Sequence, residues 1–79
     1  MPRFYFDAYD GEVFAKDEAG SDLRDAEAAR VQAQATLAEM ARTGVLRGPG
    51  RRPMFIRVLD EAGAVQLTAM LLVSYDVEG

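Results

Sequence analysis

The sequence predicts an α+β domain in the order ββαββ, with a four-stranded antiparallel sheet and one helix packed on one face. Three observations lead to this prediction. The dipeptide Asp10-Gly11 separates two β-rich runs and is a strong hairpin signal. The tetrapeptide Asp-Glu-Ala-Gly occurs at residues 17–20 and again at 60–63, and its composition is that of a tight turn with a left-handed glycine. A run of helix formers separates the two copies.

The first hairpin is predicted from residues 4–9 and 12–16, joined by the two-residue loop between them. This loop length sets the register: Ala8 opposes Val13, Phe6 opposes Ala15, and Asp7 opposes Phe14. One face of the hairpin is then wholly apolar and consists of Phe4, Phe6, Ala8, Val13 and Ala15. The other face is aromatic and charged and consists of Arg3, Tyr5, Asp7, Tyr9, Glu12, Phe14 and Lys16.

The helix is predicted to follow the first Asp-Glu-Ala-Gly turn. Ser21 or Asp22 can cap it, with Asp25 in the capping-box position, and it continues to Arg42 before the stop signal Thr43-Gly44. A helical period places one apolar stripe at Ala26, Ala29, Ala33, Leu37 and Met40, small enough to approach a sheet closely. A second, weaker stripe consists of Val31, Ala35 and Ala38. Helix propensity explains the second stripe, and a contact surface is the alternative.

Residues 45–53 are predicted to be a loop, followed by strands at 54–59 and 65–77. A three-residue loop with Gly63 left-handed joins these strands. The expected register pairs Leu59 with Val65, Arg57 with Leu67, and Phe55 with Ala69. One face of this hairpin then holds Phe55, Leu59, Val65, Leu67, Ala69, Leu71 and Val73, with Arg57 among them. The other holds Met54, Ile56, Val58, Met70 and Leu72. A single helix covers one face, so we expect another protomer on the second.

Composition limits the chain to one small domain, residues 1–79, without cysteine to cross-link it. A chain this short buries only roughly 60% of its unfolded surface, and self-association is a common way to bury more. The lack of cysteine and of a signal peptide, and a longest apolar run of five residues, predict a soluble cytoplasmic protein with no membrane contact. The net charge of −4 argues against binding nucleic acid.

Catalysis has few candidate residues here. Because the sequence has neither cysteine nor histidine, the usual nucleophile–base pairs are excluded, and the acids have turn or capping roles. The acids near residues 7–18 do not follow the spacing of a calcium loop. We therefore predict no enzyme activity, no catalytic residues, no metal and no cofactor.

Two sets of residues are candidates for contacts. Arg47, Arg51 and Arg52 form a basic, glycine-rich loop that could contact an anion or an acidic partner, or could simply solvate a connector. A second set is the possible interface on the sheet: Tyr5, Tyr9, Phe14, Met70 and Leu72.

The chain also resembles a family of short bacterial proteins of unknown function. The resemblance is carried by the Met-Pro-Arg-aromatic start, Asp10-Gly11, both Asp-Glu-Ala-Gly turns, Leu23, Asp25 and Ala28-Ala29-Arg30. It covers most of the chain and implies the same architecture, without a mechanism. A weaker resemblance, taken as an analogy, is to antitoxin domains of the HicB type. Those domains usually carry a third strand before the helix and a separate DNA-binding segment, and the sequence indicates neither here.

These observations favour a small protein-interaction module that forms a homodimer through its sheet. The alternative is an antitoxin-like or regulatory binder whose acidic half meets a basic protein partner. That half, residues 1–40, holds nine acids against four bases.

Overall fold

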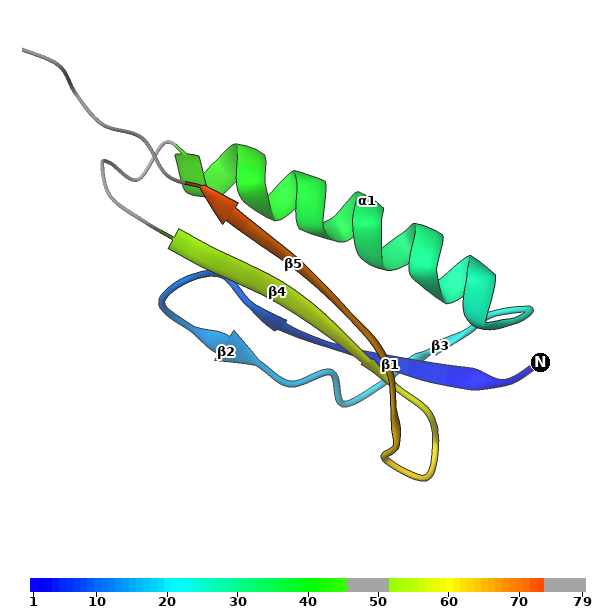
Figure 1. Cartoon of the computed structure of the whole chain (residues 1–79). Helices are drawn as coiled ribbons and strands as arrows, with labels where there is room; N and C mark the ends of the chain where they lie inside the picture. The colour runs from blue at the N-terminus through cyan, green and yellow to red at the C-terminus, as the bar shows by residue number, and fades with distance from the viewer. Residues whose placement is uncertain (46–51, 74–79) are drawn as a thin grey trace, which may run out of the picture.

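The computed structural model describes residues 1–45 and 52–73. Figure 1 shows their arrangement along the chain. The elements in order are β1 (Arg3–Tyr9), β2 (Phe14–Ala15), β3 (Ser21–Asp22), α1 (Ala26–Val45), β4 (Arg52–Leu59) and β5 (Val65–Val73).

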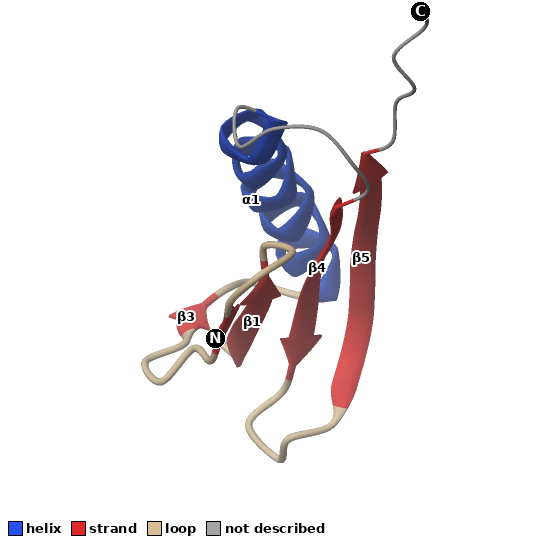
Figure 2. Ribbon diagram, turned by 90° about the vertical axis from the view of Figure 1, so that its left-hand side faces the viewer, coloured by secondary structure: helices blue, strands red, loops and turns tan. Residues whose placement is uncertain are grey.

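All the strands belong to one antiparallel sheet in the order β2-β1-β4-β5, with β3 paired to the same strand as β2. The helix lies across one face of this sheet, as Figure 2 shows. The predicted α+β class, with one helix on one face of an antiparallel sheet, is confirmed. The short strand β3 was not predicted: Ser21 and Asp22 pair with Phe4 and Arg3, so a third strand does precede the helix.

The core lies between α1 and the middle of the sheet. Three fully buried residues of β4, Met54, Ile56 and Val58, form its base. The helix contributes the buried side chains Ala29, Ala33 and Leu37. The predicted alanine stripe is therefore correct at these positions, and its small side chains let the helix sit close to the sheet. Ala26 is exposed, because it stands in the first turn of the helix, while Met40 packs against the edge of the core. The second stripe, at Val31, Ala35 and Ala38, is exposed.

The helix begins later and ends later than the sequence indicates. Asp25 is its N-cap: the carboxylate accepts the Ala28 amide at 2.9 Å, and the Asp25 carbonyl accepts the Ala29 amide at 3.2 Å. The prediction of a cap at Ser21 or Asp22 was wrong because those residues extend the sheet instead.

The first hairpin has a longer loop than predicted. Ala8 pairs with Ala15 rather than Val13, so residues 10–13 form the loop and β2 has two residues. Asp10 organises this loop: its carboxylate accepts the Glu12 and Val13 amides, both at 2.9 Å. The register shift is two residues, which leaves each remaining side chain on its predicted face.

The second hairpin carries a β-bulge that the sequence analysis missed. Gly63 has the predicted left-handed φ of 84°, and Leu59 pairs with Val65 as predicted. Beyond them the register slips by one residue between Val58 and Leu59, leaving Gln66 as the extra residue. Arg57 therefore pairs with Thr68 rather than Leu67, and Phe55 with Met70 rather than Ala69.

This one-residue slip changes the composition of both faces of the sheet. The helix-covered face holds Met54, Ile56 and Val58 with Leu67, Ala69 and Leu71. The opposite face, called the open face below, holds Phe55, Arg57 and Leu59 with Thr68, Met70 and Leu72. The predicted face that joined Met54, Ile56 and Val58 to Met70 and Leu72 was therefore wrong. As expected, one face carries no helix in the described residues, but this face holds Arg57 and Thr68 beside its apolar side chains.

Candidate functional site

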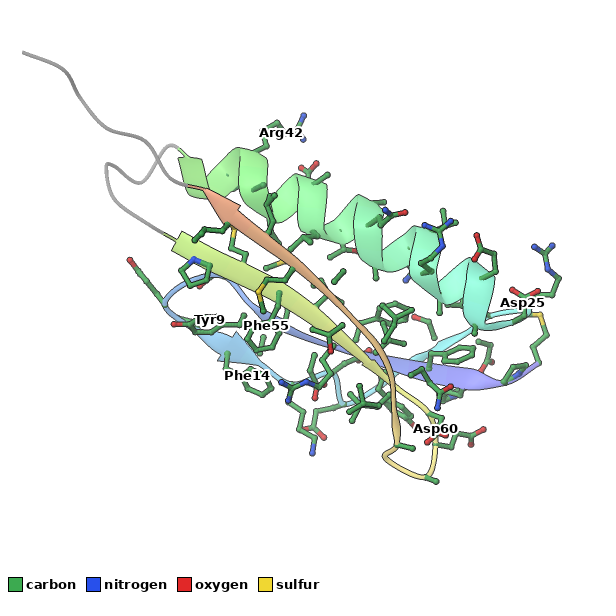
Figure 3. All side chains as sticks on the ribbon, viewed as in Figure 1. Tyr9, Phe14, Asp25, Arg42, Phe55 and Asp60 are labelled. Carbon is green, nitrogen blue, oxygen red and sulfur yellow. The ribbon has the colours of Figure 1, made fainter. Side chains whose placement is uncertain are left out.

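The open face carries an aromatic cluster at the end of the sheet where β1 meets β2. Tyr9 and Phe55 pair across the sheet with ring centroids 5.4 Å apart, and Phe14 lies 6.4 Å from Phe55. The guanidinium of Arg57 stands 5.2 Å from the Phe55 ring centroid, in cation–π distance. Figure 3 shows these rings gathered below the sheet, on the side away from the helix.

Large apolar side chains extend this cluster toward β5. Met70 pairs with Phe55 across the strands, and Leu72 follows it two residues along. The exposed fractions are 67% for Met70, 53% for Leu72 and 51% for Phe14. Exposed or half-buried apolar and aromatic side chains therefore occur on all four strands β2, β1, β4 and β5 of the open face.

The first Asp-Glu-Ala-Gly copy does more than close a turn. The Asp17 carboxylate accepts the Ala19 and Gly20 amides at 3.1 and 3.0 Å, so it holds its own turn. Its second oxygen accepts the Phe6 amide of β1 at 3.0 Å. In return, the Asp17 amide donates to the buried carboxylate of Asp7 at 3.0 Å.

These contacts set the charge of Asp17. Burial disfavours the charged form, but the amides of Gly20, Phe6 and Ala19 together outweigh it, so the pKa of Asp17 lies below its usual value of 3.8. The carboxylate is therefore ionised at neutral pH.

The second copy folds around Asp60 and stays within its own hairpin. The Asp60 carboxylate accepts the Ala62 and Ala64 amides, both at 2.9 Å, and the Gly63 amide donates to the Asp60 carbonyl at 3.0 Å. The Asp60 amide donates to the Ala64 carbonyl at 2.9 Å, which completes the predicted three-residue loop. Gln66, the bulge residue, donates to the other carboxylate oxygen at 3.0 Å.

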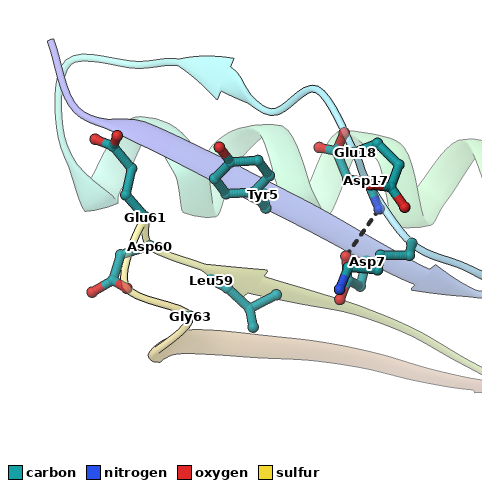
Figure 4. Close-up of a pocket in the computed structure, with 9 residues that line it drawn as sticks. Tyr5, Asp7, Asp17, Glu18, Leu59, Asp60, Glu61 and Gly63 are labelled. Atoms are coloured by element: carbon teal, nitrogen blue, oxygen red, sulfur yellow. Dashed lines mark hydrogen bonds between the residues drawn. The ribbon is translucent and has the colours of Figure 1, made fainter.

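The two copies line one pocket of about 220 Å³, between the loop after β2 and the β4–β5 turn (Figure 4). Its apolar part is made by the side chains of Tyr5 and Leu59. The remaining lining residues are Asp7, Lys16, Asp17, Glu18, Asp60, Glu61 and Gly63. Five carboxylates against one ammonium make this end of the sheet acidic.

The pocket does not have the arrangement of a metal site. Over residues 1–45 and 52–73, no three acidic side chains come together in a way that could hold a metal ion. Asp7, Asp17 and Asp60 direct oxygens at backbone amides instead. The chemistry that such a surface can offer is attraction of a cationic group beside an aromatic ring.

The sheet has two edges of different construction. Along the outer edge of β1, Arg3 and Phe4 pair with β3, and Ala8 and Tyr9 pair with β2. Between them, the Phe6 amide donates to the Asp17 carboxylate. Arg3 reinforces this edge, since its guanidinium donates to both oxygens of Asp22 at 3.0 and 3.2 Å and to the Ala19 carbonyl at 2.8 Å. In the described part of the chain, β5 pairs with β4 alone, so its other edge is open.

The predicted contact residues are only partly brought together. Tyr9, Phe14, Met70 and Leu72 share the aromatic end of the open face, whereas Tyr5 lies at the acidic end and lines the pocket. Of the predicted anion-contact residues, Arg47 and Arg51 lie outside the described residues, and Arg52 is the first residue of β4.

Two residues were not predicted from the sequence in these places: Phe55 at the centre of the aromatic cluster, and Asp17 in the lining of the pocket. The repeated tetrapeptide was the available signal for Asp17. That the two copies meet depends on the β1–β4 pairing, which joins residues about 50 positions apart in the chain.

Helices of the described segments include none that is long and apolar enough to cross a membrane. No curated protein and no solved structure matches the chain. Residues 3–72 match the sequence pattern of one protein family, described as a domain of unknown function, DUF6894. The match spans both hairpins, the helix and both Asp-Glu-Ala-Gly turns. The chain therefore belongs to the DUF6894 family.

Proposed function

We propose that this domain is a protein-interaction module that forms a homodimer through its sheet. The observation that carries the proposal is the uneven covering of the sheet. The helix buries one face, while Met70 and Leu72 on the other side stay more than half exposed. Burial of apolar surface contributes a favourable free energy of about 25 cal/mol per Å². A domain of this size gains from it, because a short chain buries a smaller fraction of its own surface on folding than a long chain does.

The role proposed is binding without catalysis. The sequence contains no cysteine and no histidine, and three of the five acids of the pocket, Asp7, Asp17 and Asp60, accept backbone amides. A self-associating module needs only complementary surfaces.

The test is the mass of the chain in solution, by size-exclusion chromatography with light scattering from about 1 to 200 µM. We expect a species of twice the 8.7 kDa chain mass, with a fraction that rises with concentration. A monomer throughout this range would contradict the proposal.

The acid-lined pocket supports a second candidate, a regulatory binder of a basic protein partner. Attraction to its carboxylates would be screened by salt, so binding of an arginine-rich peptide should weaken between 50 and 300 mM NaCl. Glu18→Gln with Glu61→Gln should weaken it further.

The matched control for this second candidate lies on the helix. Glu27→Gln with Glu39→Gln removes the same charge far from the pocket, where both acids pair with arginines. Equal binding losses in the two double variants would contradict a role of the pocket, because only net charge would then matter.

A further inference from the structure

We infer that the partner copy joins through the open edge of β5, so that two β5 strands pair antiparallel and the two sheets become one. This inference rests on the proposed function and specifies its interface. A strand edge presents a row of backbone donors and acceptors, and a second copy of the same strand is complementary to it in the antiparallel direction.

The composition of β5 fits pairing rather than exposure to water. Its nine residues, Val65–Val73, include no charged residue and no proline. Natural sheets protect a free edge with charges, prolines or bulges, or cover it with other parts of the chain. The outer edge of β1 is covered in this way by β2, β3 and the Asp17 carboxylate. β5 has one such feature, the bulge at Gln66, and it lies beside the turn, at the far end from Leu71. Over residues 67–73 the described part of the chain provides no such cover.

The positions of the exposed side chains favour the edge over the open face alone. Met70 and Leu72 point to the open face, while Leu71 points to the helix side and is still 37% exposed. A partner stacked on the open face would cover the first two and leave Leu71 in water. A strand paired along β5 covers side chains on both sides of the sheet.

Charge does not oppose a pairing centred near Leu71. The acidic pocket adjoins the other end of the strand, beside the turn that precedes Val65. At about 3.3 Å per residue, Val65 lies roughly 20 Å from a twofold axis at Leu71, so the two pockets would be about 40 Å apart. This separation exceeds the screening length of roughly 8 Å at physiological salt, so the two acidic pockets do not oppose pairing.

The first experiment compares three lysine variants by sedimentation equilibrium. We expect Leu71→Lys to raise the dimer dissociation constant at least ~10-fold, because it places like charges together at the axis. Val31→Lys, a matched exposed valine on the helix, should leave it unchanged. Phe14→Lys, at the far edge of the open face, should also leave it near the wild-type value.

A second experiment does not depend on the stability of Leu71→Lys. The chain has no cysteine, so Leu71→Cys introduces a single thiol, and opposed positions near the axis have Cβ atoms roughly 5 Å apart. Mild oxidation of Leu71→Cys should therefore give a disulfide-linked dimer. Ala19→Cys, which lies at the opposite edge of the sheet, is the control and should give almost no disulfide-linked dimer in the same time.

The outcomes separate the inference from the proposed function. A wild-type monomer would contradict both. A wild-type dimer that survives Leu71→Lys but dissociates with Phe14→Lys would overturn the β5 pairing and leave a dimer through the open face. A wild-type dimer with no Leu71→Cys cross-link would overturn the β5 pairing as well. Cross-linking at Leu71, with loss of the dimer in Leu71→Lys, would support it.

Discussion

The outer edge of β1 is occupied along its length by parts of the same chain, whereas the outer edge of β5 pairs with nothing in the described residues. We call the outer edge of β1 the closed edge. The strands that cover it, β2 and β3, have two residues each and would be weak alone. The carboxylate of Asp17 fills the interval between them by binding the Phe6 amide. On the other side of the sheet, β5 is nine residues long, uncharged and mostly apolar. The comparison shows that the chain itself covers the outer edge of β1, whereas the described residues leave the outer edge of β5 unpaired.

The two copies of the Asp-Glu-Ala-Gly tetrapeptide, at residues 17–20 and 60–63, make different contacts. In the first Asp-Glu-Ala-Gly copy, the aspartate reaches across to β1, and Gly20 packs against Arg3 and Tyr5. In the second copy, Asp60 binds its own turn, and Gly63 has no other atom within 4 Å of where a Cβ would stand. Identical turn chemistry therefore does not imply an identical role, and substitutions in the two copies should differ in effect.

Gly20→Ala should show the largest difference. Its φ of 74° strains any L side chain, and the new Cβ would stand 2.9 Å from both Arg3 Cγ and Tyr5 Cε2. Strain and overpacking together should reduce the free energy of unfolding by about 2–4 kcal/mol. Urea denaturation at neutral pH measures the free energy of unfolding. A decrease of less than about 1 kcal/mol would contradict tight packing around Gly20, because Arg3 and Tyr5 would then move aside at little cost.

Asp17→Ala should come next, with a loss of about 2–3 kcal/mol. Three amides lose a charged acceptor, and two of these hydrogen bonds, from Phe6 and Gly20, are partly buried. Asp60→Ala is the matched control and should lose only about 1 kcal/mol, since the hydrogen bonds it accepts are exposed. Equal losses in the two variants would remove the distinction between the copies.

Gly63→Ala should have a smaller effect than Gly20→Ala. The φ of 84° still disfavours alanine, but open space surrounds the position, so only backbone strain of about 1 kcal/mol applies. Thermal unfolding of both glycine variants in one buffer gives the comparison. A drop in melting temperature for Gly63→Ala that matches Gly20→Ala would mean that packing around the first turn contributes little.

Acid should weaken the closed edge through Asp17. The pKa of this carboxyl is lower in the folded state than its ordinary value of 3.8. Burial alone would raise the pKa, but the hydrogen bonds from three backbone amides lower it by more. The resulting stability is therefore present above about pH 4 and is lost as the pH falls through the folded pKa. Asp17→Asn, which cannot titrate, should have a shallower decline in unfolding free energy from about pH 5 to 2.5. Parallel curves for the variant and the wild type would contradict this account.

The two hairpins show how far sequence reasoning reaches. The loop at Asp10 was predicted too short by two residues, and a shift of two keeps every side chain on its face. The loop at Asp60 was predicted correctly, yet the bulge at Gln66 shifts the register by one and exchanges the faces of β5 relative to β4. The left-handed Gly63 follows from the local turn composition, whereas the turn residues do not specify the bulge that follows them.

The same limit applies to the helix cap and to the candidate site. Asp22 and Asp25 both suit an N-cap, and the pairing of Asp22 with Arg3, 19 residues earlier, decides between them. The pocket likewise forms because the β1–β4 pairing brings Asp17 and Asp60 to the same end of the sheet. Local patterns predicted the turns, but long-range pairing determines what the turns meet.

Amide hydrogen exchange, followed residue by residue by NMR, tests the difference between the two edges most directly. Measured well above and well below the dimer dissociation constant, the Phe6 amide of β1 should exchange slowly at both concentrations, because Asp17 binds it within one chain. The outward amides around Leu71 should be slow only at the high concentration, where a second β5 binds them. Exchange around Leu71 that does not change with concentration, in a sample shown to dimerise, would contradict the account.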